Sequence, residues 1–542
     1  MIEEPSKSDR RTHEQDDAVR ANPTKVMRTL DEINDTSLEA VPRMLAKYGI
    51  GPAERELRRL AYEKIVEKYG EPYHCTRNEA GRVKAVKVNE RHFAARLVTE
   101  GDIVHDPMDG FFGYDAKTGL WQPKTSDKLQ QHIADIIREQ ANYDGCKQLE
   151  LQICDRLQKA VASQARGISE QVNFFSQRPE CVHVANGVLV RESGELVFKE
   201  WGFSREYRSR NRCEIVYEPT AQCPRTDNEL VLMNLSEEDA KVYWQYVGLC
   251  LFGKNFPRRI LVIHGLTSGT GKSVMVNLAR KLVGGANCVE LRTQHLESRF
   301  EMDRFMGKTT LLGPDVNADF LSNTGAQALL RLTGGDLITP ETKIEKAKFA
   351  RSMVGRFCVM ISSNHFLHVR DGSAMDPWRN RLILLEALGN VPKTKISEFE
   401  DVLISEEGPG ILNRAIDGLR SLLKETEAFN LSATQKRRVE LLLNSSSSPR
   451  IFIEECVEKA AGASLTTSEL EAAYFVYCGE MNMQPREKAG QAIASSIRDL
   501  FCLNEQHSLD RNGKSKRGFR GIHFKPCKLE ILGQKGQLFS AS

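Results

Sequence analysis

The chain lacks long hydrophobic runs, and no apolar stretch approaches the ~20 residues that span a bilayer. Its start, MIEEPSKSDRRTHEQDD, lacks the apolar segment of a secretory signal. An excess of one charge is also missing, because 76 basic and 73 acidic residues leave a formal net charge of +3. These absences predict a cytoplasmic protein without a membrane partner. Any nucleic-acid binding must then come from local basic patches.

Cysteine pairs of the CxxC type are absent as well, although the chain has 13 cysteines. An odd number of scattered cysteines in a large chain predicts reduced, buried thiols rather than a disulfide framework. Cys213 and Cys223 have no second pair of ligands at zinc-finger spacing, so a zinc site is not expected. No internal repeat is visible.

The composition, 40% hydrophobic and 27% charged, is that of a globular protein with three or four domains of ~150 residues. Turn residues predict hairpins at 106–125 and 181–201, and Ser236 is the expected N-cap of a helix over 236–253. Shifts in composition predict six segments: a disordered tail (1–24), a helical region (25–100), an α+β domain (101–235), an α/β core with flanking helices (236–444), a serine-rich linker (445–449) and a C-terminal module (450–542).

The most informative stretch is RILVIHGLTSGTGKS, at 259–273, which is an apolar strand followed by a glycine-rich turn and a helix. This is the P-loop arrangement, in which backbone N–H groups and a helix N-terminus bind the phosphates of ATP. Lys272 would reach the β- and γ-phosphates, and the Ser273 hydroxyl would hold Mg²⁺. Leu266 stands where the pattern has glycine, so the loop carries one extra residue. The predicted ATP-binding residues are Gly265, Ser268, Gly269, Thr270, Gly271, Lys272 and Ser273.

ATP hydrolysis also needs an acid for Mg²⁺, a polar group near the γ-phosphate and a cation for the transition state. Asp315, at the end of KTTLLGPD, is the candidate acid and Mg²⁺ ligand. The alternative is a surface turn, because Gly313-Pro314 would end a strand. Asn364 ends the apolar strand FCVMISSN, at the sheet edge where α/β proteins bind ligands, and would orient the attacking water. Arg379 and Arg381, just before another apolar strand, are the candidate cations.

Two basic segments are candidate DNA contacts. The segment LTGGDLITPETKIEKAKF contributes Lys343 and Lys346, although a solvated charged loop is the alternative. The run RNGKSKRGFRGIHFKPCK interleaves Phe519 and Phe524 with cations, as phosphate contacts and base stacking require, and a solvated hairpin is the alternative. Its predicted DNA-binding residues are Arg511, Lys514, Lys516, Arg517 and Arg520. The helix at 488–500 before it is a candidate recognition helix, with Gln491, Ser495 and Arg498 on one face.

The stretch 260–387 resembles the superfamily III helicases, in particular the phage and plasmid primase-helicases related to the poxvirus primase-helicase. Lys272, Asp315 and Asn364 follow in the family's order, with LTGGDLITPETK between them and a D-x-S-x-A…R stretch after SSN. GYDAKTGLW and VANGVLVRESGEL resemble the family's preceding domain, and 450–528 resembles its C-terminal module. The resemblance therefore covers about 100–528.

The resemblance implies an α/β P-loop (AAA+-like) ATPase core with an α+β N-terminal domain and a C-terminal winged-helix module. It also implies a homo-hexameric, ATP- and Mg²⁺-dependent DNA helicase of a phage or mobile element, with single-stranded DNA in the ring pore and duplex DNA at the C-terminal module. Lys343 and Lys346 would line the pore. A finger arginine would act on a neighbour's ATP, and Arg381 is favoured over Arg379 because it abuts the strand LILLE.

The chain departs from the family pattern in two places. Asn317 stands near the position of a second acid, with Asp319 further on, so the general base is left open. Residues 1–100 contain no strand-embedded carboxylate pair with a downstream histidine, so primase activity is not expected and a separate primase or initiator is a possible partner. The alternative function is an ATP-switched DNA-binding initiator or defence-type ATPase with little unwinding activity.

Overall fold

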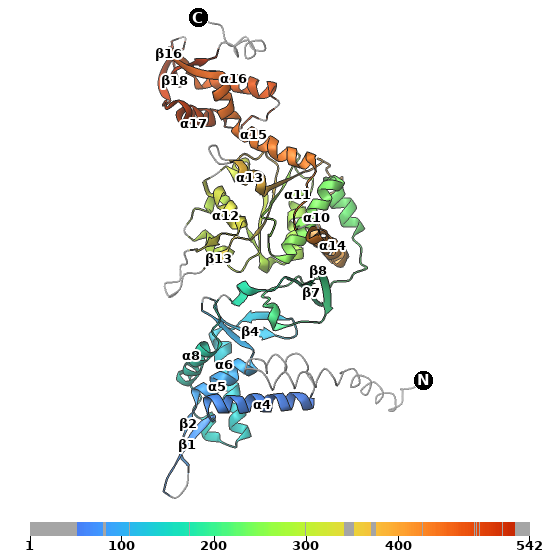
Figure 1. Cartoon of the computed structure of the whole chain (residues 1–542), viewed down its shortest axis with the longest axis vertical. Helices are drawn as coiled ribbons and strands as arrows, with labels where there is room; N and C mark the ends of the chain where they lie inside the picture. The colour runs from blue at the N-terminus through green and yellow to red at the C-terminus, as the bar shows by residue number, and fades with distance from the viewer. Residues whose placement is uncertain are drawn as a thin grey trace, which may run out of the picture. The chain divides into compact units, whose positions relative to one another are not determined.

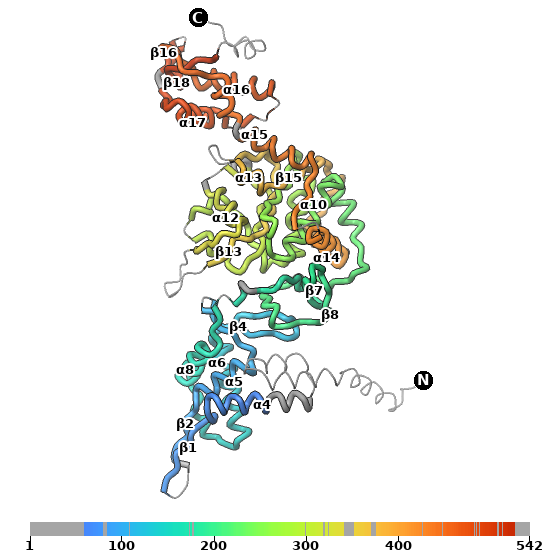
Figure 2. Tube along the Cα trace, viewed as in Figure 1, coloured from blue at the N-terminus to red at the C-terminus, as the bar shows by residue number. Residues whose placement is uncertain are grey.

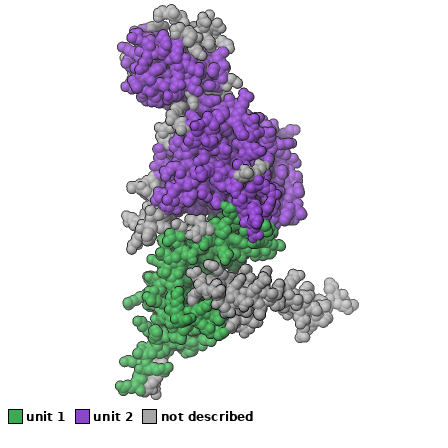
Figure 3. Space-filling view, viewed as in Figure 1, with its two compact units in different colours: residues 1–190, 197–212 green, residues 191–196, 213–542 purple. Residues whose placement is uncertain are grey.

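The computed structural model describes residues 51–525 except 80–82, 108, 173, 299, 323, 341–351, 370–374, 425–426, 482, 484, 487 and 512. Figure 1 shows the chain as a ribbon. The chain divides into two compact units, which the space-filling view of Figure 3 colours green and purple. The N-terminal unit comprises 1–190 and 197–212, and the C-terminal unit comprises 191–196 and 213–542. In the described part of the chain, no helix is long and apolar enough to cross a membrane.

The N-terminal unit combines helices with small antiparallel sheets. Its main helices are α4 (Gly51–Tyr69), α5 (Glu90–Glu100), α6 (Ser126–Tyr143), α7 (Lys147–Glu150) and α8 (Asp155–Ser169). Its strands form three small sheets. The first pairs β1 (Tyr73–Arg77) with β2 (Val83–Val88), and the second contains β3 (Ile103–Asp106), β4 (Gly110–Asp115) and β5 (Leu120–Pro123). The third contains β6 (Cys181–Val184), β7 (Gly187–Glu192) and β8 (Glu195–Glu200). Both predicted hairpins are confirmed, since β4 pairs with β5 and β7 neighbours β8.

The C-terminal unit contains a parallel sheet in the order β10-β11-β14-β9-β15. The strands are β9 (Ile260–His264), β10 (Cys288–Glu290), β11 (Thr310–Val316), β14 (Cys358–Ser363) and β15 (Leu382–Glu386). The first four residues of β9 and all of β14 are buried, as expected for parallel strands covered on both faces. After β9 the chain crosses to the far edge and returns through β11 and β14, so β14 lies between β9 and β11. The carboxyl ends of these three strands meet where the strand order reverses, which is where open α/β sheets bind ligands.

Helices that are distant in sequence cover this sheet. α10 (Glu237–Phe252) and α14 (Phe399–Lys424) lie side by side, as Figure 2 shows, and α11 (Lys272–Val283) packs on β11 and β14. A Cβ atom on Gly248 would lie 2.2 Å from the Ala415 carbonyl oxygen, so α10 and α14 approach closely only because this position is glycine. Ser236 caps α10 by accepting the Asp239 N–H, which confirms the predicted helix start.

A short insertion between β11 and β14 reaches the amino edge of the sheet. It contains α12 (Ala328–Gly334) and the paired strands β12 (Leu337–Ile338) and β13 (Met353–Val354). α13 (Met375–Arg381) then leads directly into β15.

The end of the described chain forms a further hydrophobic core. In order, its elements are α15 (Ala433–Cys456), β16 (Val457–Thr466), α16 (Thr467–Glu480), α17 (Ala489–Phe501), β17 (Gln506–Arg511) and β18 (Lys514–Phe524). The strands form an antiparallel sheet in the order β16-β18-β17, and Phe452, Tyr474, Ile493 and Phe519 are fully buried against it. The predicted helices and basic strand pair are therefore present.

The predicted linker at 445–449 is wrong, because these residues lie inside α15. Ser446 is fully buried, and its Oγ accepts the Val369 N–H at 2.9 Å and donates to the Leu442 carbonyl at 2.8 Å. The Ser448 hydroxyl lies 2.7 Å from the Tyr474 hydroxyl. A serine whose hydroxyl donates to a carbonyl of the preceding turn can stay within a helix. The small side chains of these serines also let neighbouring segments approach the helix closely.

Candidate functional site

The segment between β9 and α11, residues 265–271, is called the glycine loop here. Gly269 (φ +76°) and Gly271 (φ +102°) have left-handed backbone conformations that other residues rarely adopt. Gly271 caps α11, which begins at Lys272, so the unpaired N–H groups of the first helical turn face the loop. Such a helix start attracts anions.

Lys272 is held inside this loop. Its side chain is buried, and its ammonium group donates to the Thr267 carbonyl at 2.6 Å and to the Thr270 hydroxyl at 3.3 Å. Burial lowers the pKa of Lys272, and the nearby Asp315 opposes this shift. The ammonium group therefore rests on two neutral oxygens that an anionic ligand would replace.

Asp315 and Asn364 meet at the carboxyl edge of the sheet. Asn364 Nδ2 donates to Asp315 Oδ1 at 2.7 Å, and the Asp315 N–H donates to the Ser362 hydroxyl at 3.1 Å. Gly313-Pro314 does not end the strand, because β11 continues to Val316 with a shift of register, which contradicts the surface-turn alternative for Asp315. Asp315 has a left-handed backbone (φ +59°), a strained conformation that is common at functional sites.

Asn364 also carries a polar atom without a partner. Among the described residues, its Oδ1 is buried and accepts no hydrogen bond. Buried amide oxygens are normally satisfied by protein or by ordered water. The atom lies beside the Asp315 carboxylate, so a water or ligand group at this point would satisfy it.

One cavity of about 540 Å³ joins these residues. Residues 268–271 of the glycine loop line it together with Lys272, Asp315 and Asn364, whereas the predicted Gly265 is not among its lining residues. Two segments that sequence reasoning missed complete its walls: one lies before α10, and the other runs from β15 to the first residue of α14. They contribute Leu230, Met233, Lys393, Lys395, Ile396 and Phe399. Neither segment carries a motif, so only the tertiary fold shows that they belong to the site.

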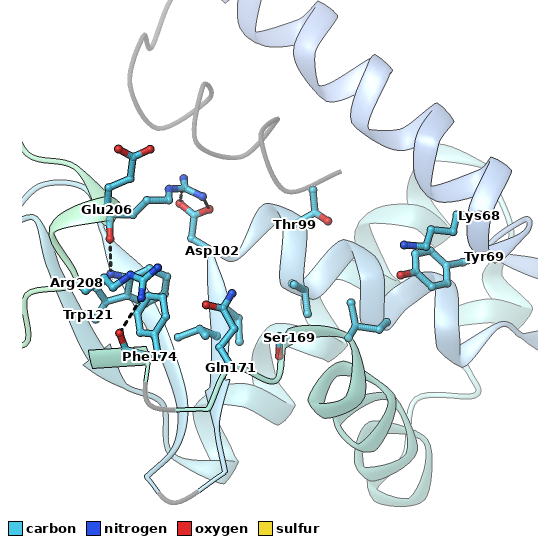
Figure 4. A pocket seen from close by; sticks show the side chains of 15 residues that line it. Lys68, Tyr69, Thr99, Asp102, Trp121, Ser169, Gln171, Phe174, Glu206 and Arg208 are labelled. Carbon is cyan, nitrogen blue, oxygen red and sulfur yellow. Dashed lines mark hydrogen bonds and ion pairs between the residues drawn. The ribbon is translucent and has the colours of Figure 1, made fainter. Parts of the chain in front are cut away.

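A second cavity, of about 400 Å³, lies in the N-terminal unit (Figure 4). Its arginines already have partners. Arg205 forms an ion pair with Asp102, and Arg208 donates to the Phe174 carbonyl at 3.1 Å and lies over the Phe174 ring. This cavity therefore offers a phosphate group less unpaired charge than the one at the glycine loop.

The structure does not bring the two candidate finger arginines to the cavity at the glycine loop. Arg379 forms ion pairs with Asp376 and, at 2.6 Å, with Glu440 of α15. Arg381 lies at the amino edge of the sheet, where burial and the nearby Arg258 lower its pKa while Asp336 raises it. The five residues of β15 separate the two edges by about 16 Å at ~3.3 Å per residue, so Arg381 cannot act on its own chain's glycine loop.

The predicted DNA contacts have different environments. Lys343 and Lys346 lie outside the described residues. Lys514, Lys516, Arg517 and Arg520 are exposed on β18. Arg511 is instead tied by an ion pair to Glu469 at 3.0 Å.

The predicted stacking role of Phe519 and Phe524 is wrong. These rings are 0% and 5% exposed and belong to the hydrophobic core beneath β18. Successive residues of a strand point to opposite faces, so a basic strand on a core alternates cations with buried apolar residues. On α17, Gln491 and Arg498 are exposed and Ser495 is partly exposed, as their shared face predicted.

The chain shows limited similarity to known proteins. A family model described as a family of unknown function (DUF5906) matches residues 263–381, the segment that holds Lys272, Asp315, Asn364 and Arg381. No curated protein matches the chain. A solved apo structure of the NrS-1 C terminal region (305-718) is similar at 12% identity with a TM-score of 0.41, covering 79% of this chain and 98% of that one. An A-form apo structure of the same region has 11% identity and a TM-score of 0.40, covering 80% and 99%.

Proposed function

We propose that the chain is an ATP-dependent DNA helicase or translocase that works as a homo-hexamer in the replication of a phage or mobile element and has no primase domain of its own. The observation that carries this proposal is the convergence of Lys272, Asp315 and Asn364 on one cavity at the carboxyl edge of a parallel sheet. These residues come from three separate places: Lys272 from the start of α11, Asp315 from β11 and Asn364 from the end of β14. They supply the cation, the acid and the polar group that phosphoryl transfer requires.

In this proposal, ATP binds with its phosphates along the glycine loop. Lys272 leaves the Thr267 carbonyl and contacts the β- and γ-phosphates. Leu230, Met233, Ile396 and Phe399 provide apolar walls of the kind that enclose a base. Lys393 and Lys395 line the same cavity, and Lys395 Nζ would lie 3.1 Å from a Cβ atom on Gly269, so this ammonium group adds positive charge beside the phosphates.

Mg²⁺ fits the oxygen donors present, because the Ser273 hydroxyl and the Asp315 carboxylate line the same cavity. The ion would neutralise charge that develops on the phosphates. Asn364 then holds Asp315 through its Nδ2 group. Its unpartnered Oδ1 accepts a hydrogen bond from the attacking water and so orients that water toward the γ-phosphate.

Two surfaces would bind DNA. Lys343 and Lys346, which follow β12, would grip single-stranded phosphates in the pore of the ring. The element order from α15 to β18 fits a winged helix, with α17 as the recognition helix and β17–β18 as the wing. The exposed cations of β18 would then contact duplex phosphates.

The test is ATP hydrolysis with and without DNA, together with strand displacement on forks with 3′ or 5′ tails. We expect Lys272→Ala to lower hydrolysis by ~10³-fold or more and to abolish displacement, because the described cavity offers no equivalent cation on the loop. Unchanged hydrolysis in this variant would refute the proposal. ATP-dependent DNA binding without displacement would instead identify an ATP-switched initiator or defence-type ATPase.

A further inference from the structure

The second cavity, in the N-terminal unit, has the make-up of a ligand site. It is called the N-terminal cavity here, and all of its lining residues belong to that unit (Figure 4). Its volume of about 400 Å³ lies within the usual range for small-molecule pockets. Its apolar and aromatic lining residues are Tyr69, Val98, Ile103, Val104, Trp121, Ile168 and Phe174. Ligand sites combine such walls with a few polar groups that fix the orientation of the ligand.

Two polar side chains line this cavity without a hydrogen-bond partner. Thr99 is 4% exposed, and its hydroxyl makes no hydrogen bond with any residue that the structure describes. The Gln171 carboxamide makes none within the described part of the chain either, and Figure 4 shows it extending into the cavity. The Ser169 hydroxyl donates to the Ala165 carbonyl at 2.7 Å, so its oxygen can still accept. The cavity therefore offers both donors and acceptors to a ligand.

The aromatic wall of the cavity is fixed in place by other contacts. Trp121 and Phe174 are buried, and their ring centroids lie 4.9 Å apart in an edge-to-face arrangement. Trp121 Nε1 donates to the Arg205 carbonyl at 3.0 Å. The Arg208 guanidinium lies over the Phe174 ring, 4.6 Å from its centroid. A flat ligand would therefore meet preorganised rings, and its binding would cost little side-chain entropy.

Two residues of the cavity wall have strained backbones. Asp102 (φ +47°) and Arg208 (φ +48°) adopt the left-handed conformation that is uncommon outside glycine. Such conformations persist only where the surrounding structure imposes them, and they cluster at ligand sites. Asp102 also forms an ion pair with Arg205, which joins the start of β3 to the segment after β8. The strain is therefore located in the residues that hold the wall together.

The charges around the cavity nearly balance. Its cations are Lys68, Arg205 and Arg208, and its acids are Asp102 and Glu206, so three positive and two negative charges leave a surplus of one. The ion pair between Arg205 and Asp102 neutralises one charge of each sign. A free triphosphate would find little opposing charge here. The group that fits inside the cavity is therefore uncharged.

We propose that the N-terminal cavity takes a single unstacked base of single-stranded DNA. The base packs against the Trp121 and Phe174 rings, and its edge forms hydrogen bonds with Thr99 and Gln171. Proteins recognise single-stranded bases by this combination of aromatic packing and hydrogen bonds to the base edge. The phosphate of the same nucleotide stays in solvent, near the exposed Lys68. This inference goes beyond the proposed function, because the site needs neither ATP nor its hydrolysis.

The chemistry of the cavity favours a DNA base over two other flat ligands. A phenylalanine ring from a partner protein would fill the space but would leave the Thr99 hydroxyl and the Gln171 carboxamide unsatisfied, which is costly for buried groups. A free nucleotide would bring its charged phosphates to a site with a surplus of one positive charge. A base within a strand presents donors and acceptors on its edge, while its charge remains on the backbone outside.

A photo-crosslink locates the base. The probe is a short single-stranded DNA that has one 4-thiothymidine and is otherwise abasic, irradiated with the full chain in the absence of ATP. We expect adducts on the peptides that carry Trp121 or Phe174. Oligo(dT) should compete for this crosslink at least ~10-fold better than a fully abasic strand of the same length, because stacking of the base supplies much of the affinity. Adducts confined to β18 or to the segment around Lys343 would overturn the inference. Equal competition by thymidine triphosphate would also overturn it and assign the cavity to a free nucleotide.

Two variants test the polar groups of the cavity. Thr99→Val removes the hydroxyl at nearly constant volume, and Gln171→Ala removes the carboxamide. Gln148→Ala, at an exposed glutamine on α7 of the same unit, is the control. We expect each cavity variant to weaken the crosslink by ~3- to 10-fold, as the loss of one hydrogen bond does, and the control to match the wild type.

Thermal unfolding should be the same for Gln171→Ala and the control, which separates the loss of binding from misfolding. Unchanged crosslinking in both cavity variants would overturn the inference, since an apolar group from another protein would then explain the cavity better. Strand displacement by the wild type without any crosslink in the N-terminal unit would also overturn it and would leave the proposed function standing.

Discussion

Asp315 combines a strained backbone with a carboxylate that Asn364 holds in place. Asparagine tolerates the left-handed backbone as well as aspartate does, so Asp315→Asn changes the charge and little else. We expect this variant to bind ATP normally and to lose at least ~100-fold of turnover, because the acid for Mg²⁺ is gone. Binding of a fluorescent ATP analogue and steady-state hydrolysis measure the two effects. Normal turnover would show that another acid, with Asp319 as the first candidate, performs this role.

His183 makes the N-terminal unit sensitive to acid. The ring is 2% exposed, stacks on Phe203 and pairs through Nε2 with the Thr118 carbonyl at 3.1 Å. Burial lowers its pKa to about 3, whereas the unfolded value is about 6.5. His183 is therefore neutral in the folded protein, and its stabilising effect is complete above pH 6.5 and is lost as the pH falls toward 3.

Between pH 7.5 and 5.5 this residue should remove about 1.4 kcal/mol from the free energy of unfolding. Urea denaturation at several pH values measures the decrease. His183→Phe keeps an aromatic ring on Phe203 and cannot titrate, so its stability should fall less steeply with acid. Burial lowers the pKa of His92, His105 and His132 too, so part of the pH dependence should remain in the variant. An identical pH dependence in variant and wild type would contradict the role of His183.

At the scale of elements, α15 runs unbroken through the serine segment. Ser446→Pro should destabilise the protein by about 3 kcal/mol or more, because proline removes a helical hydrogen bond and cannot replace the Oγ hydrogen bonds to Val369 and Leu442. Asn444→Ala, at an exposed position two residues earlier, should be neutral or slightly stabilising. Thermal unfolding compares the two variants. Equal stability would mean that the segment behaves as a linker after all.

The elements also show what sequence reasoning can reach. The glycine loop, Asp315 and Asn364 were predictable because each lies at or just after the end of an apolar strand and carries a local chemical signature. The linker prediction for the serine segment was wrong because serine and proline favour loops locally. Buried hydrogen bonds to Val369 and Tyr474 decide its conformation instead. The apolar cavity walls have no local signature. Their residues come from separate stretches that only the sheet order brings together.

At the scale of the whole molecule, the exposed cations of β18 should set the salt dependence of duplex binding. Replacing Lys514, Lys516 and Arg517 by alanine should weaken binding and make the dependence on salt shallower, by about one unit of slope for each phosphate that is no longer neutralised. Basal hydrolysis should be retained, because these residues lie on a strand that packs on a different hydrophobic core from that of the parallel sheet. Dissociation constants at several salt concentrations measure the slope. An unchanged slope would remove the winged-helix assignment.

Strand β9 has a different kind of residue at each end: the glycine loop follows His264, and Arg258 precedes Ile260 by two positions. In the proposed hexamer, this short, buried strand would position the loop that holds one nucleotide and, at its other end, an arginine next to Arg381, the candidate finger for another nucleotide. In a closed ring, each subunit would respond to the nucleotide of the neighbour on one side and present its own nucleotide to the neighbour on the other. The effect of ATP hydrolysis would then pass from subunit to subunit around the ring in one direction. A single inactive subunit would reduce hydrolysis in its neighbour on one side alone.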